Sequence, residues 1–245
     1  MPVHLQKEIN RLKKLALSLS ARVEENLRAA VRAVTDRDAL LARRVIEADR
    51  GIDRTEVDVE EECLKILALH QPVANDLRYI VAILKINHDL ERVGDLAVSI
   101  AERAEALADG PAFEIPFDLP SLASKVQTML SSSLDAMINL DAGLARRTWL
   151  SDDDIDRRNR EAYAKITERL HRDPDHVDGL IALLSISRNL ERIGDHATNI
   201  AKDVLYIVEG EIFRHRSSEF GKSAGAGSPA GPSAEQSVNP GEEKT

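Results

Sequence analysis

Acidic residues recur four positions apart at four places in the chain, a spacing that puts two carboxylates on one face of a helix. Like charges at this spacing destabilise a helix by roughly 0.2–0.5 kcal/mol, so each pair needs compensation from elsewhere. A cation shared between carboxylates would provide it, which makes the pairs candidate metal ligands. They are Asp49 with Asp53, Glu91 with Asp95, Asp152 with Asp156, and Glu191 with Asp195.

The pairs are also placed symmetrically about two predicted helix turns. Residues equally far from the turn of an antiparallel helix hairpin lie at the same level. Asp49 and Asp95 each lie 23 residues from Pro72. Asp53 and Glu91 each lie 19 residues from the same proline, and the later acids are centred likewise on a turn of their own. We therefore predict a first acidic cluster (Asp49, Asp53, Glu91, Asp95) and a second acidic cluster (Asp152, Asp156, Glu191, Asp195).

Four carboxylates in a partly dehydrated interface repel one another unless they are protonated or bridged by cations. The donors are hard oxygens, and the single cysteine, Cys63, lies among apolar residues as a buried side chain would. This chemistry favours Mg²⁺, Ca²⁺, Mn²⁺ or iron over a structural zinc, with more than one ion per cluster allowed. Gly94 and Gly194 beside the acids indicate a close approach of backbone or ligand, or tight helix packing. The alternative is that the acids are solvated helix faces without metal.

Other charged residues near the clusters receive separate interpretations. His88 and His196 do not occupy equivalent places in the two halves of the chain, so we expect them at the surface or at a helix cap. Arg92 and Arg192 directly follow the glutamates, and successive helical residues point in different directions. We therefore expect these arginines to meet other acids or a binding partner.

The elements that must position the clusters are long amphipathic helices. Apolar residues recur with a period of 3.6 and predict helices over about 5–34, 39–69 and 74–108. Asp38 is a candidate N-cap, and Pro72 separates the second helix from the third. Aromatic residues make up only 3% of the chain and charged residues 31%, a composition typical of a helix bundle.

The helical pattern is duplicated, which is the most informative feature of the sequence. Residues 38–49 align without gaps on 141–152, and residues 81–102 align on 181–202 with about half of the positions identical. The predicted fold is all-α, with six long helices in two pseudo-symmetric antiparallel three-helix bundles. The predicted domains are a first repeat at 1–109, a proline-rich linker at 110–120, a second repeat at 121–209 and a largely disordered tail at 210–245.

Composition excludes several classes of protein. The net charge of −9 argues against a groove that binds nucleic acid, because such grooves use clustered Lys and Arg to neutralise phosphates. A lone cysteine cannot form an intramolecular disulfide, and neither a signal-peptide core nor an apolar membrane span is present in the sequence. No nucleophile motif or phosphate-binding glycine loop occurs. We predict a soluble, non-enzymatic, cytoplasmic protein, or one held at the inner membrane by its partners.

Three motifs resemble the PhoU proteins of bacterial phosphate signalling: QPVANDLRYI at 71–80, LERVGDLAVSIA at 90–101 and LERIGDHATNIA at 190–201. The resemblance extends over about residues 5–209. It implies multinuclear metal clusters on the eight acids named above, with iron foremost and manganese, magnesium, calcium or zinc as alternatives. One departure is that the NDLR stretch at 75–78 has no counterpart in the second half.

The resemblance also implies a function. PhoU proteins look like adaptors between the phosphate ABC transporter, through its ATPase subunit PstB, and the sensor kinase PhoR. They are negative regulators of phosphate uptake and of the phosphate-starvation response. The large helical faces additionally favour a homodimer. Two alternatives stay open: a carboxylate-bridged dimetal enzyme, against which the absence of Glu-x-x-His motifs near the acids argues, and a metal-free structural scaffold.

Overall fold

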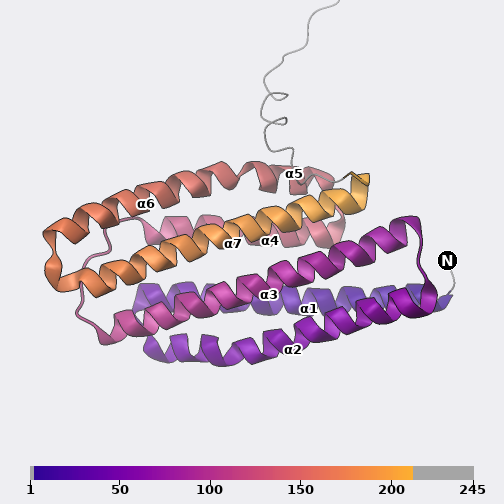
Figure 1. The fold of residues 1–245 in the computed structure, drawn as a ribbon, viewed down its shortest axis with the longest axis horizontal. Coiled ribbons are helices and arrows are strands. Elements are labelled where there is room, and N and C mark those ends of the chain that lie inside the picture. Colours follow the sequence, from indigo (N-terminus) through magenta and orange to yellow (C-terminus); the bar gives the residue numbers. More distant parts are fainter. Residues whose placement is uncertain (1–2, 212–245) are drawn as a thin grey trace, which may run out of the picture. The chain divides into compact units, whose positions relative to one another are not determined.

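The structure is a computed structural model that describes residues 3–211. These residues fold into helices without a β-strand among them, as Figure 1 shows. The predicted all-α fold is therefore confirmed, with one predicted helix divided in two. The elements are α1 (Val3–Asp36), α2 (Ala39–His70), α3 (Ala74–Asp109), α4 (Leu119–Asn139), α5 (Ala142–Leu150), α6 (Asp152–Arg172), the 3-10 turn η1 (Pro174–His176) and α7 (Val177–Glu209).

The chain beyond residue 211 contains most of the segment predicted to be a disordered tail. That prediction falls, from residue 212 onward, outside the described residues. The described chain ends just after Gly210, which closes α7 with a backbone φ of 77°. Glycine adopts this left-handed conformation without the steric cost that other residues bear. Within residues 3–211, no helix is both long enough and apolar enough to cross a membrane.

The first turn of each repeat is built in the same way. Arg37 and Leu140 both adopt left-handed backbone conformations, with φ of 52° and 51°. Asp38 and Asp141 follow them as N-caps, and each side chain accepts a hydrogen bond of 2.9 Å from the backbone N–H three residues on. The duplication seen in the sequence therefore extends to matching turn geometry.

The apolar stripe predicted for the first helix forms the core of its bundle. Leu12, Leu19, Val23 and Leu27 on α1 are all at most 1% exposed. Full burial of an aliphatic side chain of this kind stabilises the fold by about 1.5–3 kcal/mol. Burial of this apolar stripe therefore stabilises the first bundle.

The fifth predicted helix is interrupted at Ser151. Ser151 N donates to Thr148 O at 3.1 Å, and Asp154 N donates to Ser151 O at 3.3 Å, which are the shorter-range bonds of a 3-10 turn. The Ser151 hydroxyl also donates to Thr148 O at 2.7 Å. The equivalent residue of the first repeat, Ala48, lies inside the continuous helix α2. Asp152 consequently begins a new helix, where the partial positive charge of the N-terminus favours acids.

Two sets of contacts hold the linker between the repeats against the helices. The Arg37 guanidinium donates to the carbonyls of Gly110 at 2.8 Å and Pro111 at 3.2 Å. Farther along, Phe113 lies so close to Gly179 on α7 that an added β-carbon there would be 2.3 Å from the phenylalanine ring. A side chain at residue 179 would displace the ring.

The linker is also shorter than the sequence suggests, because α4 begins at Leu119. Asp118 is its N-cap and accepts a hydrogen bond from Ser121 N at 3.0 Å. Pro120, which we counted as a linker residue, lies in the first turn of α4. A missing N–H costs nothing at that position, and the fixed φ of proline suits it.

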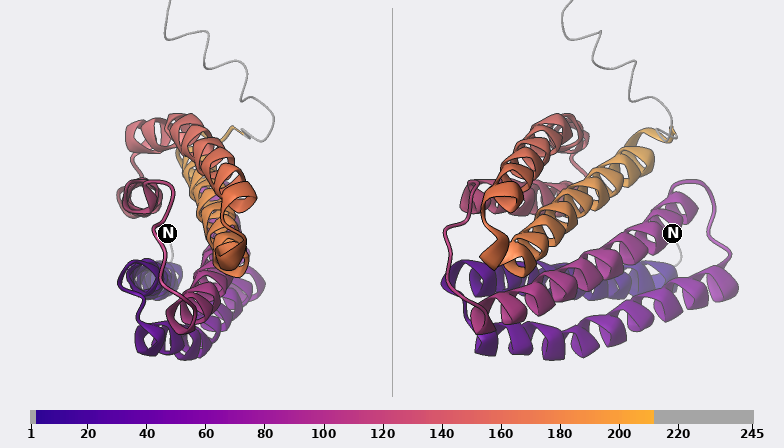
Figure 2. Two further views of the ribbon diagram at one scale, coloured as in Figure 1. Left: turned by 90° about the vertical axis from the view of Figure 1, so that its left-hand side faces the viewer. Right: turned by 60° about the vertical axis from the view of Figure 1, so that its left-hand side comes forward.

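The third helices of the two repeats, α3 and α7, make the most extensive helix–helix contact of the described chain. Figures 1 and 2 show α3 and α7 side by side, each belonging to one half of the helical fold. Polar side chains lie within this contact. Asp89 Oδ1 lies 2.8 Å from His196 Nδ1 and accepts a 3.4 Å hydrogen bond from Asn199 Nδ2. Asn189 and Ser99, at the positions equivalent to Asp89 and Asn199, form the matching 3.0 Å bond.

Candidate metal centre

The first acidic cluster lies where α2 and α3 run side by side. Asp49 points at Gly94, since a β-carbon added to that glycine would be 3.3 Å from Asp49 Oδ1 and 3.4 Å from Ile52. The absence of a side chain at residue 94 thus allows a carboxylate of α2 to approach the backbone of α3 closely. Glu91 and Asp95 flank this contact on α3, and the predicted approach of the two helices' acids is observed.

The four acids of the first cluster are near enough for their charges to affect one another. The pKa of Asp49 is raised to about 6, first by burial and then by the negative charges of Asp53, Asp95 and Glu91. Burial also raises the pKa of Glu91, with Asp95 and Asp53 adding to the effect. Asp49 and Glu91 are half-buried, while Asp53 and Asp95 are exposed. The cluster therefore occupies the solvent edge of the hairpin.

One oxygen of this cluster is buried without a hydrogen bond. Glu91 Oε2 has no hydrogen-bond partner among the described residues. The Arg92 guanidinium makes ion-pair contacts with Glu91 Oε2 at 3.3 Å and with Asp95 Oδ2 at 3.1 Å. Our expectation that Arg92 would face elsewhere is therefore wrong, because its long side chain curls back along the helix. Arg92 partly neutralises the first cluster.

The second acidic cluster repeats this arrangement between α6 and α7. Burial raises the pKa of Asp152 to about 6, with Asp195 and Asp156 as the next contributions. Burial likewise raises the pKa values of Glu191 and Asp195, and Asp156 adds to both. A β-carbon added to Gly194 would lie 3.2 Å from the Ile155 side chain and 3.9 Å from Asp152 Oδ1. The acids of the second acidic cluster therefore also approach one another.

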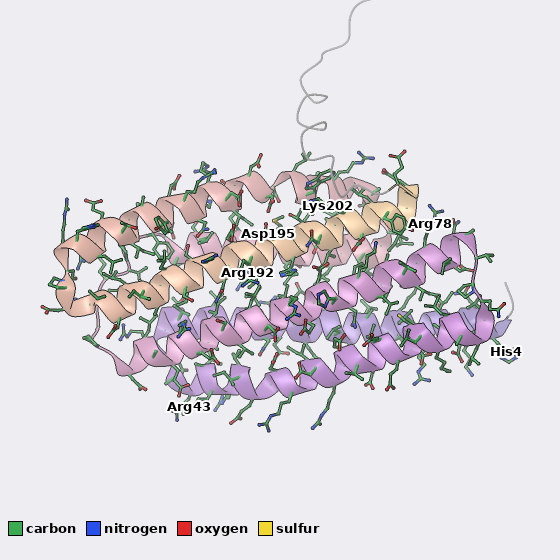
Figure 3. The ribbon with its side chains drawn as sticks, viewed as in Figure 1. His4, Arg43, Arg78, Arg192, Asp195 and Lys202 are labelled. Atoms are coloured by element: carbon green, nitrogen blue, oxygen red, sulfur yellow. The ribbon has the colours of Figure 1, made fainter. Side chains whose placement is uncertain are left out.

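The second cluster differs from the first in its counter-ions. Figure 3 shows Asp195 and Arg192 close together on α7, with Lys202 farther along the same helix. His196, Lys202 and Arg192 all lower the pKa of Asp195, against the larger effect of burial. In contrast to Arg92, Arg192 forms no ion pair in the part of the chain that the structure describes. Among the described residues, the second cluster therefore has cations nearby but lacks the arginine ion pairs of the first cluster.

The residues of both clusters fit a hard cation by their chemistry. Every donor is a carboxylate oxygen, and Gly94 and Gly194 let α2 and α6 approach α3 and α7 closely. Glu91 Oε2 is buried and has no hydrogen bond among the described residues, although Arg92 lies 3.3 Å from it. In residues 3–211, however, no three His, Cys, Asp or Glu side chains stand in a metal-ligating arrangement. Mutual repulsion of unbridged carboxylates is a physical reason for them to stand apart. The ligand assignment stays a prediction.

The raised pKa values predict how the metal-free protein responds to pH. Asp49 and Asp152 have pKa values of about 6 in the folded protein, against 3.8 in the unfolded chain, so the folded state holds these protons more tightly. The free energy of unfolding therefore falls as the pH rises from 3.8 to about 6. Allowing for solvent screening, we expect a loss of about 1 kcal/mol per site. The measurement is the melting temperature of chelator-treated protein at pH 4.5 and 7. Asp49→Asn with Asp152→Asn should lose less stability over this interval, and an equal loss in this variant would contradict the prediction.

The structure adds polar residues that the sequence analysis overlooked or misjudged. His196 lies in the contact between α3 and α7 beside the buried Asp89, and not at the surface or a cap as expected. Asp89 was not singled out at all. The signal was present, since the 100-residue offset pairs Asp89 with Asn189, and in both halves a short polar side chain comes directly before a Leu-Glu-Arg sequence. A comparison of polar residues across the repeat would have found them.

Comparison with known proteins identifies the family. The PhoU domain matches this chain twice, over residues 16–104 and 119–204. The chain belongs to the PhoU family. The resemblance seen in the sequence motifs is thereby confirmed, and the two matches fall on the helices α1–α3 and α4–α7.

Relatives across bacteria support this assignment over most of the chain. The phosphate-specific transport system accessory protein PhoU homolog of Pseudomonas aeruginosa is 37% identical over 209 residues, which cover 85% of this chain and 86% of the homolog. PhoU homolog 1 of Thermotoga maritima is 33% identical over 210 residues, which cover 85% and 90%.

Solved PhoU structures have the same fold. The crystal structure of PhoU from Pseudomonas aeruginosa matches with a TM-score of 0.82 at 37% identity, over 84% of this chain and 99% of that one. The phosphate transport system regulatory protein PhoU from Streptococcus pneumoniae matches with a TM-score of 0.76 at 28% identity, over 85% and 98%. These matches confirm the predicted fold of two three-helix bundles.

Proposed function

We propose that this protein is a non-enzymatic accessory protein of a phosphate transport system. It restrains phosphate uptake and the phosphate-starvation response when phosphate is plentiful. The observation that carries the proposal is the similarity, over about 85% of the chain, to PhoU relatives that are named as accessory and regulatory proteins of phosphate transport. The two repeats act as the two domains of this adaptor.

The eight acids of the two clusters hold metal in this proposal. Asp49 and Asp53 on α2 face Glu91 and Asp95 on α3, and the second cluster has the same layout on α6 and α7. Iron is the foremost candidate, and manganese, magnesium, calcium or zinc are alternatives. A bound cation would neutralise the carboxylates and tie the two helices of each hairpin together. The buried Glu91 Oε2 and the raised pKa values of Asp49 and Asp152 support this assignment.

The proposed partners are the transporter and the kinase. The protein binds the ATPase subunit PstB and the sensor kinase PhoR in the cytoplasm, at the inner face of the membrane, and assembles as a homodimer. Support comes from the relatives, whose names associate them with the transport system. The helical bundle presents long exposed faces to such partners.

Deletion of the gene is the test of this function. We expect alkaline phosphatase activity to be derepressed in high-phosphate medium, because the restraint on the kinase is lost. A plasmid copy of the natural gene should restore repression, and a copy carrying Asp95→Asn with Asp195→Asn should not. The measurement is phosphatase activity in whole cells at high and low phosphate. Normal repression in the deletion strain at high phosphate would contradict the signalling role.

A further inference from the structure

The first repeat contains a hollow of about 300 Å³ between α1 and α2, apart from the acidic cluster. Its walls are apolar and include Ala29 and Val45. Its polar groups are Arg22, Asn26 and Arg44, with the exposed Glu25 on the rim. The hollow thus combines two cationic side chains and an amide over an apolar surface.

Asn26 is the buried polar group of this hollow. It is only 5% exposed, and its Nδ2 has no hydrogen-bond acceptor within residues 3–211. An unsatisfied buried donor costs about 1–3 kcal/mol. A hydrogen-bond acceptor on a bound ligand would remove that cost, so the buried amide indicates a ligand that carries acceptor atoms.

Within residues 3–211, Arg22 and Arg44 have no counter-ion. Neither Arg22 nor Arg44 makes an ion pair or a hydrogen bond with another described residue, Glu25 included. Arg22 Nη1 reaches across to α2, where it lies 3.1 Å from the place that a β-carbon on Gly51 would occupy. The side chain therefore extends over a position that carries no acid.

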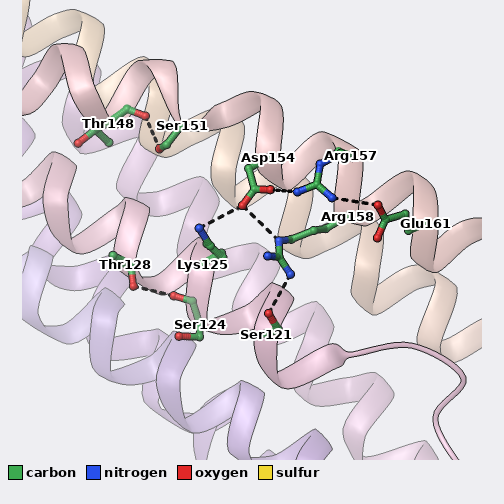
Figure 4. A network of polar contacts seen from close by, with 10 residues as sticks. All are labelled: Ser121, Ser124, Lys125, Thr128, Thr148, Ser151, Asp154, Arg157, Arg158 and Glu161. Atoms are coloured by element: carbon green, nitrogen blue, oxygen red, sulfur yellow. Dashed lines mark hydrogen bonds and ion pairs between the residues drawn. The ribbon is translucent and has the colours of Figure 1, made fainter.

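In the second repeat, a carboxylate lies at the position equivalent to Gly51. By the 103-residue offset, Lys125 stands for Arg22 and Asp154 stands for Gly51. Figure 4 shows Asp154 at the centre of a cationic network. Its carboxylate lies 3.1 Å from Lys125 Nζ and 3.2 Å from Arg158 Nε, and Arg157 contacts it as well. In the second repeat the chain thus provides its own anion.

The electrostatics of that network confirm that the place favours negative charge. Hydrogen bonding to Lys125, with further contributions from Arg158, lowers the pKa of Asp154 to about 2. The position equivalent to Asn26 is Met129, which has no amide to satisfy. The second repeat therefore has the carboxylate and lacks the extra donor, whereas the first has the donor and lacks the carboxylate.

We infer that the hollow of the first repeat binds an oxyanion from solution, held by Arg22, Arg44 and the Asn26 amide. Guanidinium groups present paired N–H donors that match the oxygens of phosphate, sulfate or a carboxylate. The bound anion takes the position that the Asp154 carboxylate has in the second repeat. The inference uses none of the acidic-cluster residues and does not depend on the proposed function.

The test is isothermal titration of the full-length protein with inorganic phosphate, sulfate and acetate at fixed ionic strength. We expect one saturable site per chain, and affinity at least tenfold weaker in Arg22→Ala and in Asn26→Met. Gly51→Asp should abolish binding, because it installs the carboxylate of the second repeat beside Arg22. Arg28→Ala, which removes an exposed arginine from the same helix, should leave affinity unchanged.

Further variants separate this site from the acidic clusters and from loss of folding. Asp95→Asn should bind the anion as the natural protein does, whether or not it still binds metal. Melting curves of each variant identify any that fail to fold, and Gly51→Asp introduces a residue that the equivalent helix already accommodates. Absence of saturable binding by all three anions would overturn the inference. Binding that survives in folded Arg22→Ala and Gly51→Asp would overturn it equally.

Discussion

Replacing Asp95 and Asp195 together by asparagine is expected to remove most of the metal bound by the purified protein and to leave its helical content unchanged. Each substitution takes one carboxylate from a cluster of four and weakens the charge that attracts a divalent cation. Both side chains are exposed at the edge of their hairpins, so their loss leaves the apolar core intact. Elemental analysis of protein purified without a metal-affinity tag measures the first effect, and far-ultraviolet circular dichroism measures the second.

The matched control removes the same amount of charge from outside the cluster. Glu47 on α2 and Glu102 on α3 are exposed acids of the first hairpin that belong to neither cluster. Glu47→Gln with Glu102→Gln should retain the metal. If the Asp95 and Asp195 variant kept its full metal content, the ligand assignment would be rejected.

The second large effect is expected where the two repeats meet. Asp89→Ala should destabilise the protein by about 2 kcal/mol, because it leaves the largely buried His196 side chain without its partner and also removes the longer bond from the exposed Asn199. For a chain of this length, this corresponds to a melting temperature lower by roughly 4–8 °C. Differential scanning calorimetry of the two proteins side by side measures it.

The second repeat provides the control for this substitution. Its residue at the equivalent position, Asn189, is an amide that bonds Ser99 across the same contact at 3.0 Å. Asp89→Asn keeps an acceptor oxygen in place and should cost less than half as much as alanine. Equal destabilisation by alanine and asparagine would mean that the hydrogen bonds across the contact contribute little.

The helices could be predicted from the sequence to within a few residues where local signals mark their ends. Asp38 and Pro72 bracket the second helix, predicted over 39–69 and observed as Ala39–His70. The interruption at Ser151 was missed, because the apolar period continues through it and only the hydrogen-bond geometry of the turn reveals the break. Pro120 misled the linker boundary, since proline is a helix breaker only beyond the first turn.

The convergence of the acids followed from spacing about a turn, which depends on backbone geometry alone. The position of the Arg92 guanidinium could not be predicted from spacing, because a long side chain adopts one of several rotamers according to nearby charges that the sequence does not locate. The contact between Asp89 and His196 also required the packing of α3 on α7, a relation between residues more than 100 positions apart. Such contacts become predictable only once the arrangement of the helices is known.

The ion pairs of Arg92 have a consequence for how the two halves would fill with metal. A cation entering the first cluster must displace a guanidinium from Glu91 and Asp95, whereas the second cluster presents no such competitor on Arg192. The second half would then load at lower free-ion concentrations than the first. The two halves of the protein would thus begin to take up metal at different concentrations of the free ion.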